Sequence, residues 1–235
     1  MKKFLKTIAQ RFGYDIQHLP TDPLVRRWLD LMHTNSIDLV FDIGANIGQY
    51  AQRIRALGYR GDIVSFEPMG EAYQQLRARA ATDSRWQTVH TGVGHYDGTA
   101  VINISTNSYS SSILDILPLH IESAPDAVYT RQEPIYVQRL DSLIDQFYQP
   151  GKNLFVKIDT QGFERQVFEG SQKSLDKIRG FQMELSLQPL YKGETLIQEM
   201  IVLLRQQGFT LKLMESGYCN DRTGELIQVE GYFFR

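Results

Sequence analysis

At residues 39–48 the chain reads Leu39-Val40-Phe41-Asp42-Ile43-Gly44-Ala45-Asn46-Ile47-Gly48. A short apolar run that holds an acid and ends in a glycine turn is typical of a buried strand, and a helical pattern begins at Gln49. A second apolar run follows and also ends in an acid, Ile63-Val64-Ser65-Phe66-Glu67-Pro68. Together they predict a strand, loop, helix, strand unit with a carboxylate at each strand's carboxyl end, where open α/β sheets bind ligands.

The same alternation continues along most of the chain. The apolar patterns predict strands at 39–43, 62–67, 86–91, 153–159 and 179–186, and helical segments at 48–57, 70–81, 163–177 and 194–207. Such alternation is typical of a parallel sheet wrapped by helices. Two short strands, 99–104 and 134–139, interrupt it. The last two strands, 209–215 and 226–234, are joined by a turn at 220–224 and predict an antiparallel hairpin that closes the sheet.

Length and composition fit one domain. The chain has 235 residues, of which 42% are hydrophobic, enough for one continuous core. We interpret 1–235 as a single domain, with an N-terminal helical extension at 1–36 and a catalytic core at 37–235. Thr21-Asp22-Pro23 favours a helix start within the extension. The net charge of −2 gives no sequence-wide reason to expect a nucleic acid as partner.

The cysteine content and the apolar runs of the sequence also indicate a cellular location. A single cysteine, Cys219, favours a reducing, cytoplasmic compartment, and no apolar run reaches the ~20 residues that span a bilayer. Phe4, Leu5, Ile8 and Phe12 recur at helical spacing among basic residues. Such a helix either packs on its own domain or a second subunit, which we favour, or touches a membrane surface. A homo-oligomer is compatible with the first alternative.

The residues of the glycine turn suit a particular ligand. Gly44 and Gly48 let the backbone turn sharply and approach a ligand, and the helix after Gly48 presents free N–H groups to a carboxylate. Asp42 is suited to an ammonium group and Glu67 to both hydroxyls of a ribose. The ligand indicated is a nucleoside with a positively charged amino-acid tail. A nicotinamide dinucleotide is disfavoured, because Asn46 replaces the second glycine of that fingerprint and Asp42 would repel a pyrophosphate.

Six ordered blocks carry a resemblance to a known family. They are Phe41-Asp42-Ile43-Gly44-Ala45-Asn46-Ile47-Gly48, Ser65-Phe66-Glu67-Pro68, Ser110-Ser111-Ser112, Arg139-Leu140-Asp141, Lys157-Ile158-Asp159-Thr160-Gln161-Gly162-Phe163-Glu164 and Met183-Glu184-Leu185-Ser186. In these blocks the chain resembles the S-adenosylmethionine-dependent methyltransferases of the FkbM type. The resemblance implies an α/β, Rossmann-like, seven-stranded class I methyltransferase sheet with helices on both faces and the last strand antiparallel. It also implies methyl transfer to a hydroxyl oxygen of a saccharide or related natural product.

The resemblance further implies the residues that hold S-adenosylmethionine. The methionine portion would lie against Asp42 and the glycine loop, Gly44, Ala45, Asn46 and Gly48. Glu67, followed by Pro68, would hold the ribose. Gly92, Val93 and His95 would flank the adenine, with His95 standing where many relatives carry an acid.

Three residues of the second half are catalytic candidates: Asp159, Lys157 and Glu184. Asp159 ends a predicted strand, where a carboxylate can accept the hydroxyl proton or orient a sugar diol. Lys157 on the same face is either paired with an acid, Glu184 on the adjacent strand being the suggested partner, or part of the site. Asp159 and Glu184 are a thin basis for a divalent cation, so no metal is predicted.

The polar run from Ser105 to Ser112 is either a functional loop over the site or a solvated connection. Ser111, Ser112 and Gln161 are the predicted substrate contacts, while Tyr109 and Tyr191 are weaker candidates for stacking on a sugar ring. The predicted partner is a small-molecule or glycan acceptor, without nucleic acid or stable membrane insertion. Two alternatives to O-methylation stay open: N-methylation of an amine, and a cofactor-binding subunit without activity.

Overall fold

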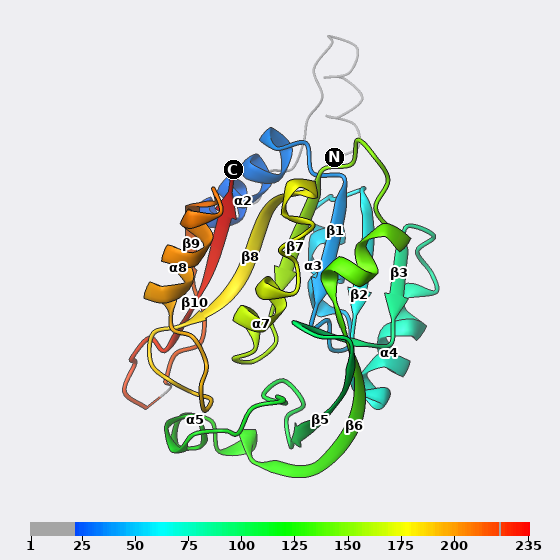
Figure 1. Ribbon diagram of the computed structural model, residues 1–235. Helices are drawn as coiled ribbons and strands as arrows, with labels where there is room; N and C mark the ends of the chain where they lie inside the picture. The colour runs from blue at the N-terminus through cyan, green and yellow to red at the C-terminus, as the bar shows by residue number, and fades with distance from the viewer. Residues whose placement is uncertain (1–21, 221) are drawn as a thin grey trace, which may run out of the picture.

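The computed structural model describes residues 22–220 and 222–235 (Figure 1). The amphipathic segment Phe4–Phe12 lies outside the described residues. One seven-stranded sheet has the order β3-β2-β1-β7-β8-β10-β9. Its strands are β1 (Leu39–Ile43), β2 (Asp62–Phe66), β3 (Trp86–Val89), β7 (Leu154–Ile158), β8 (Ile178–Ser186), β9 (Thr210–Ser216) and β10 (Gln228–Phe234).

The predicted antiparallel last strand is confirmed. Strands β3, β2, β1, β7 and β8 pair in parallel, whereas β10 pairs antiparallel with both β8 and β9. The hairpin therefore places β10 inside the sheet and leaves β9 at the edge, as Figure 1 shows by the red strand between the yellow and orange ones.

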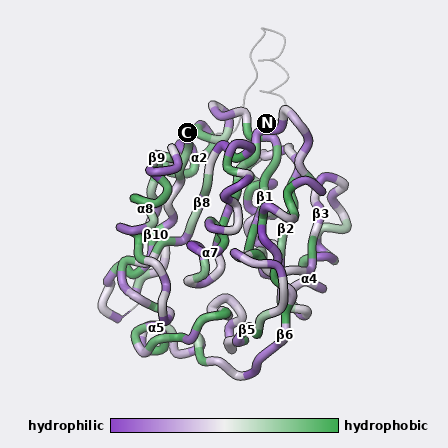
Figure 2. The backbone as a smooth tube through the Cα atoms, viewed as in Figure 1, coloured by the Kyte–Doolittle hydropathy of each residue, from purple (hydrophilic) through white to green (hydrophobic). Residues whose placement is uncertain are grey.

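Helices cover both faces of this sheet. Apolar side chains of α2 (Pro23–Thr34), α3 (Gln49–Ala56) and α4 (Gly70–Ala80) pack on one face, against Val40, Ile63 and Phe155 among others. The opposite faces of the same strands pack against α6 (Leu140–Leu143), α7 (Glu164–Glu169) and α8 (Ile197–Gln206). Because both faces are covered, every residue of β1 and β7 is buried and these strands are mostly apolar (Figure 2).

The helix starts follow local chemistry. Asp22 caps α2, accepting a hydrogen bond from the Leu24 N–H at 2.8 Å, and Pro23 occupies the first turn as predicted. The helical turns expected through 163–177 are helix α7 and a 3₁₀ turn at Leu175–Lys177. No helix among residues 22–220 and 222–235 combines the length and apolarity that crossing a membrane requires.

A second sheet was not anticipated. The predicted strand 86–91 ends at Val89, and Gly92–Gly94 forms a separate strand, β4, beside β6 (Tyr129–Arg139). β6 also pairs with β5 (Gly98–Ser105), so the two short strands expected in the middle of the chain belong to this three-stranded sheet. The connection from β5 to β6 contains helix α5 (Pro118–Ser123) and a 3₁₀ turn at Pro125–Ala127.

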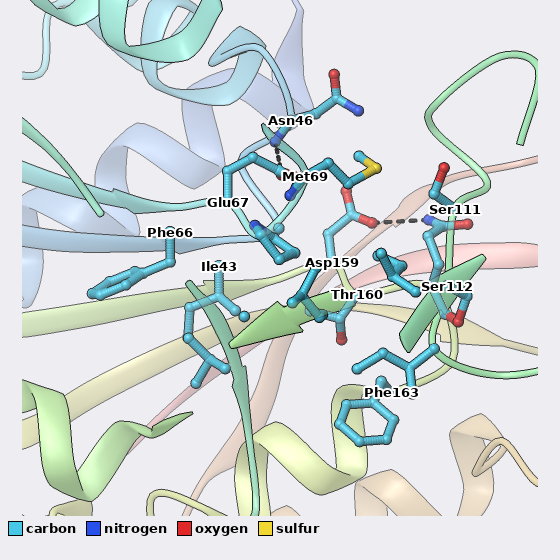
Figure 3. Close-up of a pocket in the computed structure, with 18 of the residues that line it drawn as sticks. Ile43, Asn46, Phe66, Glu67, Met69, Ser111, Ser112, Asp159, Thr160 and Phe163 are labelled. Carbon is cyan, nitrogen blue, oxygen red and sulfur yellow. Dashed lines mark hydrogen bonds between the residues drawn. The ribbon is translucent and has the colours of Figure 1, made fainter. Parts of the chain in front are cut away.

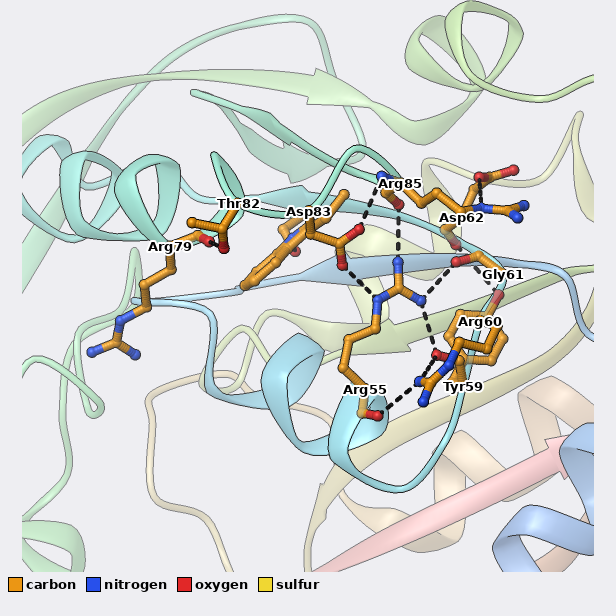
Figure 4. Close-up of polar contacts among 11 residues, drawn as sticks. Arg55, Tyr59, Arg60, Gly61, Asp62, Arg79, Thr82, Asp83 and Arg85 are labelled. Atoms are coloured by element: carbon orange, nitrogen blue, oxygen red, sulfur yellow. Dashed lines mark hydrogen bonds and ion pairs between the residues drawn. The ribbon is translucent and has the colours of Figure 1, made fainter. Parts of the chain in front are cut away.

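The side chain of Arg55 connects helix α3 to two loops at the amino end of the sheet (Figure 4). Its guanidinium contacts Asp83 at 2.7 Å and donates to three backbone carbonyls, those of Tyr59, Gly61 and Arg85. These bonds join α3 to the loops that lead into β2 and β3. A planar group with five N–H donors can serve all four acceptors at once, which an ammonium group cannot.

We therefore expect Arg55→Lys to destabilise the fold by about 1–3 kcal/mol, because carbonyls lose their donors while the charge is kept. Urea unfolding measures the change. Arg60→Lys is the control, since Arg60 lies on the loop between α3 and β2, is exposed and donates only to two carbonyls. Equal stability of the two variants would contradict this account of Arg55.

Candidate functional site

A cavity lies at the carboxyl ends of the central strands (Figure 3). The glycine loop and Glu67 form one side, and Asp159, Gln161 and Glu184 another. The remaining lining comes from the ends of β1 and β2, the second sheet and the residue before it, the Ser105–Ser112 loop with Ile113, and the segment between β7 and α7: Ile43, Phe66, Pro68, Met69, Thr91, Gly92, Val93, Ile102, Ser108, Tyr109, Ser111, Ser112, Ile113, Ile135, Thr160 and Phe163. Three acids line this cavity, and no lysine, arginine or histidine is among the described lining residues.

Glu67 is held rigidly at the cavity wall. One carboxylate oxygen accepts the Asn46 N–H at 2.7 Å, drawn dashed in Figure 3, and the other accepts the Met69 N–H at 2.8 Å. Burial raises the pKa of Glu67 to about 7, although both N–H bonds favour its ionised form. The carboxylate is thus fixed with further lone pairs free, the arrangement that suits two hydroxyls of a ribose.

The glycine loop is shaped by its neighbours in the protein. Gly44 has φ +76°, and a Cβ there would lie 1.8 Å from the carbonyl oxygen of Asp159. Gly48 has φ +92°, and its Cβ would press on the ring of Trp86. The fold itself therefore leaves no room for a side chain at either position, and the expected approach of a ligand to these glycines stays a prediction.

Lys157 pairs with two acids on its own face of the sheet. Its ammonium lies 3.1 Å from Asp159 and 3.4 Å from Asp42. The suggested pairing with Glu184 is wrong, because the parallel register sets Lys157 opposite Asp42 on β1 and Gln182 on β8, two residues short of Glu184. Burial alone lowers the pKa of Lys157, but Asp159 and Asp42 outweigh it and hold that pKa above its usual value.

A row of polar side chains crosses the sheet beneath α3. Ser65 donates to Asp42 at 3.1 Å, and Asp42 pairs with Lys157. Gln182, the register neighbour of Lys157, donates to Glu230 at 2.9 Å. The Gln182 Oε1 is buried and has no hydrogen-bond partner among the described residues. Such an atom is costly unless a ligand or water donates to it.

Gln161 bridges the two acids at the other side of the cavity. Its amide nitrogen donates to Asp159 at 2.9 Å and to Glu184 at 2.7 Å, while its oxygen accepts the Tyr191 hydroxyl at 2.7 Å. Gln161 adopts φ +55°, a conformation that is strained for a residue with a Cβ. Tyr191 is fully buried behind this amide, so the expectation that it stacks on a sugar is wrong.

The loop from Ser105 to Ser112 lies over the cavity. The Ser111 hydroxyl accepts the Ser105 N–H at 3.0 Å, and the Ser112 hydroxyl donates to the Gln161 carbonyl at 2.6 Å. Both predicted substrate serines therefore line the cavity, but Ser111 bonds within the loop and Ser112 bonds to the backbone of Gln161. Gln49 donates to the Tyr109 hydroxyl at 3.2 Å, which joins the loop to the start of α3.

A second cavity opens beneath the same loop. Gly44, Asn46, Tyr109 and Asp159 line both cavities, so the two adjoin there. The second cavity continues toward the polar row and is lined further by Ala45, Gln49, Tyr50, Arg53, Lys157, Gln182 and Glu230. It therefore carries side chains of both charges.

Three predicted cofactor residues are not among the residues that line either cavity. Asp42 is fully buried under its partners Lys157 and Ser65, because it lies inside β1 rather than at its end. Gly48 is enclosed by Trp86, and His95 is exposed and packs against Tyr96 and Phe163. Met69, Phe163, Gln182 and Glu230 were missed. Gln182 and Glu230 could have been found in the sequence, because each is a polar residue within an otherwise apolar predicted strand.

In the described part of the chain, no three His, Cys, Asp or Glu side chains gather as a metal site. Asp159 and Glu184 are instead joined through the amide of Gln161.

The sheet order, the reversed β10 and the glycine loop between β1 and α3 define the class I methyltransferase fold. The profile of the family described as "Methyltransferase FkbM domain" matches residues 42–211. The chain therefore belongs to the FkbM methyltransferase family, and the predicted resemblance and fold class are confirmed. S-adenosylmethionine is the methyl donor of this family. No curated protein sequence matches the chain.

Solved structures resemble the chain only distantly. Methyltransferase FkbM from Methylobacillus flagellatus KT is 14% identical, over 83% of this chain and 43% of its own, with a TM-score of 0.47. The chain thus spans less than half the length of that protein. An rRNA methylase from Streptococcus thermophilus is 10% identical over 92% of this chain and 98% of its own, with a TM-score of 0.47. The N-terminal domain of human METTL16, in complex with SAH, is 11% identical over 98% and 80%, with a TM-score of 0.45. Similarities at this level do not identify the methyl acceptor of this chain.

Proposed function

We propose that this protein transfers a methyl group from S-adenosylmethionine to a hydroxyl of a saccharide or related natural product. The observation that carries the proposal is one cavity with the fixed carboxylate of Glu67, suited to the hydroxyls of a ribose, on one side and two further acids, Asp159 and Glu184, on another. When bound, S-adenosylmethionine supplies an electrophilic methyl group on a positively charged sulfur.

The residues of the two adjoining cavities fit this donor. Glu67 would hold the ribose hydroxyls, and the apolar wall of Val93, Ile102 and Phe163 suits an adenine ring. The second cavity suits the zwitterionic methionine tail, because Lys157 and Arg53 line it together with Asp159 and Glu230. The buried Gln182 Oε1, which has no hydrogen-bond partner among the described residues, could accept a hydrogen bond from the ammonium group of this tail.

Asp159 is our candidate for orienting the acceptor hydroxyl and taking its proton. Its side chain is about one-third exposed, at 30%, and is held in place by Lys157 and Gln161. Each carboxylate oxygen keeps a lone pair free for the hydroxyl. Because Lys157 and Gln161 hold the Asp159 carboxylate in one position, alignment of the acceptor is expected to contribute more than base strength.

Calorimetric titration with S-adenosylhomocysteine, with NAD as the comparison, tests the donor assignment. Tight binding of the former alone supports it, and a folded protein that binds neither compound would refute it. Turnover is then sought with glycans and hydroxylated natural products. Activity that survives Asp159→Asn would favour N-methylation, since an amine needs less help from a base. Donor binding without turnover on every acceptor would favour a non-catalytic subunit.

The affinity for S-adenosylhomocysteine should depend on pH through Glu67. Ribose hydroxyls donate to the ionised carboxylate, so binding favours loss of the Glu67 proton, whose pKa is raised to about 7. Affinity is expected to rise from about pH 6 to about pH 8, by at most tenfold per unit below the pKa, and then to level off. Calorimetry in two buffers of different ionisation enthalpy measures the released proton. Constant affinity with no proton release would contradict this.

The remaining expectations form part of the same proposal. The partner is a small-molecule or glycan acceptor rather than a nucleic acid or a membrane, and the single cysteine supports a reducing, cytoplasmic location. A homo-oligomer and a single domain over 1–235 stay predictions.

A further inference from the structure

The first cavity, at the carboxyl ends of the central strands, is lined by acidic side chains without a basic one among the residues that the structure describes. Its described lining residues include three acids, Glu67, Asp159 and Glu184, and no basic side chain. Lys157 reaches Asp159 from the second cavity, and the donor's sulfonium adds one more positive charge. Because Lys157 also pairs with the buried Asp42, the carboxyl groups around this site outnumber the positive charges, and a carboxylate without a positive partner is costly in a protein interior.

Glu184 is the acid without a partner charge. No lysine, arginine or histidine of the described residues pairs with it, and its hydrogen bond comes from the neutral amide of Gln161. Burial raises the pKa of Glu184 well above its usual range, and the nearby carboxylate of Asp159 raises it further. Glu184 lines the first cavity but not the second one, so the methionine tail proposed for the second cavity leaves Glu184 without a positive partner.

We propose that the acceptor is a saccharide that carries a protonated amino group, and that Glu184 binds this ammonium while Asp159 faces the neighbouring hydroxyl. This rests on the proposed function and narrows its substrate class to amino sugars. An ammonium group gives Glu184 the missing positive charge together with a charge-assisted hydrogen bond. Anionic acceptors, such as sugar phosphates and uronic acids, are disfavoured because three carboxylates would repel them.

Ligand-observed NMR on the full chain loaded with S-adenosylhomocysteine tests this. The matched probes are D-glucosamine, D-glucose and N-acetyl-D-glucosamine, with D-galactosamine and D-galactose as a second pair. In at least one pair the amino sugar is expected to bind about tenfold tighter than the neutral sugar. This factor corresponds to the lower limit of what a hydrogen bond to a charged group contributes to the binding free energy. The N-acetyl sugar, whose amide is neutral, should bind like glucose. Equal affinities in both pairs, or no binding of either amino sugar, would overturn the proposal.

Glu184→Gln provides the decisive variant, because a glutamine keeps the size of the side chain and an oxygen for the Gln161 amide. It should abolish the amino-sugar preference, whereas the control Glu199→Gln, at a side chain that is 69% exposed on α8, should keep it. A preference that persists in Glu184→Gln overturns the assignment. Loss of S-adenosylhomocysteine binding in Glu184→Gln also overturns it, since Glu184 would then serve the donor. Absence of this binding in the wild type instead refutes the proposed function.

Discussion

Replacing Glu67 by alanine is expected to weaken S-adenosylhomocysteine binding by about 100-fold or more. Two hydrogen bonds from ribose hydroxyls to a charged acceptor contribute about 1.5–3 kcal/mol each, and their loss gives this factor. The Asn46 and Met69 N–H groups also lose their acceptor, so the glycine loop keeps only its backbone hydrogen bonds to Phe66 at the end of β2. Isothermal calorimetry of the variant beside the wild type measures the change.

Glu67→Gln should not rescue this binding. Both oxygens of Glu67 accept backbone N–H groups, so an amide would turn its NH₂ against one of them. The control is Glu71→Ala, which removes an acid that is 75% exposed in the first turn of α4 and pairs only at the surface with Arg131. Its affinity should stay within about twofold of the wild type. Wild-type affinity in Glu67→Gln would show that the ionised carboxylate is not what the ligand needs.

Lys157→Met is expected to lower the free energy of unfolding by about 3–5 kcal/mol, the usual cost of removing one partner from a buried ion pair. The substitution keeps the apolar stem but leaves Asp42, which is fully buried, and Asp159 facing each other without a cation. Urea unfolding followed by circular dichroism measures the loss.

A second substitution separates charge from packing. Lys157→Met combined with Asp42→Asn should recover part of the lost stability, because one unpaired charge is removed. Lys152→Met is the matched control: Lys152 also contacts two acids, Asp38 and Asp62, but at the protein surface. Its expected cost is at most about 1 kcal/mol. If Lys157→Met and Lys152→Met cost the same, the buried pairing of Lys157 is not what stabilises the sheet.

Much of the fold was predictable because its information is local. Apolar runs of four to six residues separated by helical periodicity indicated each strand of the large sheet, and the structure has them within a few residues. The glycine turn after β1 and the acid after β2 were predictable for the same reason. The residues that form a sharp turn or end a strand are neighbours in the sequence. Glu67 and Pro68 line the cavity, and so do Gly92 and Val93, which the family resemblance implied.

Contacts between distant segments were not predictable in this way. Asp42 and Lys157 are adjacent only because β1 pairs with β7, and a single-residue slip in that register would turn Lys157 to the other face. The placement of Gln182 opposite Lys157, and of Glu230 beside Gln182, likewise depends on the pairing of three strands far apart in the chain. Tyr191 was misassigned because its burial behind Gln161 arises from a later loop folding under the Ser105–Ser112 segment.

The sequence by itself therefore determined the order of strands and helices, the glycine turn and the acid that ends β2, since each is encoded by neighbouring residues. Only the tertiary structure decided which acids are neutralised. Strand register joins Lys157 to Asp42 and Asp159, and Gln161 links Asp159 to Glu184 without supplying a charge. The physical reason is that charge compensation depends on distances of a few ångströms between residues that the chain separates widely.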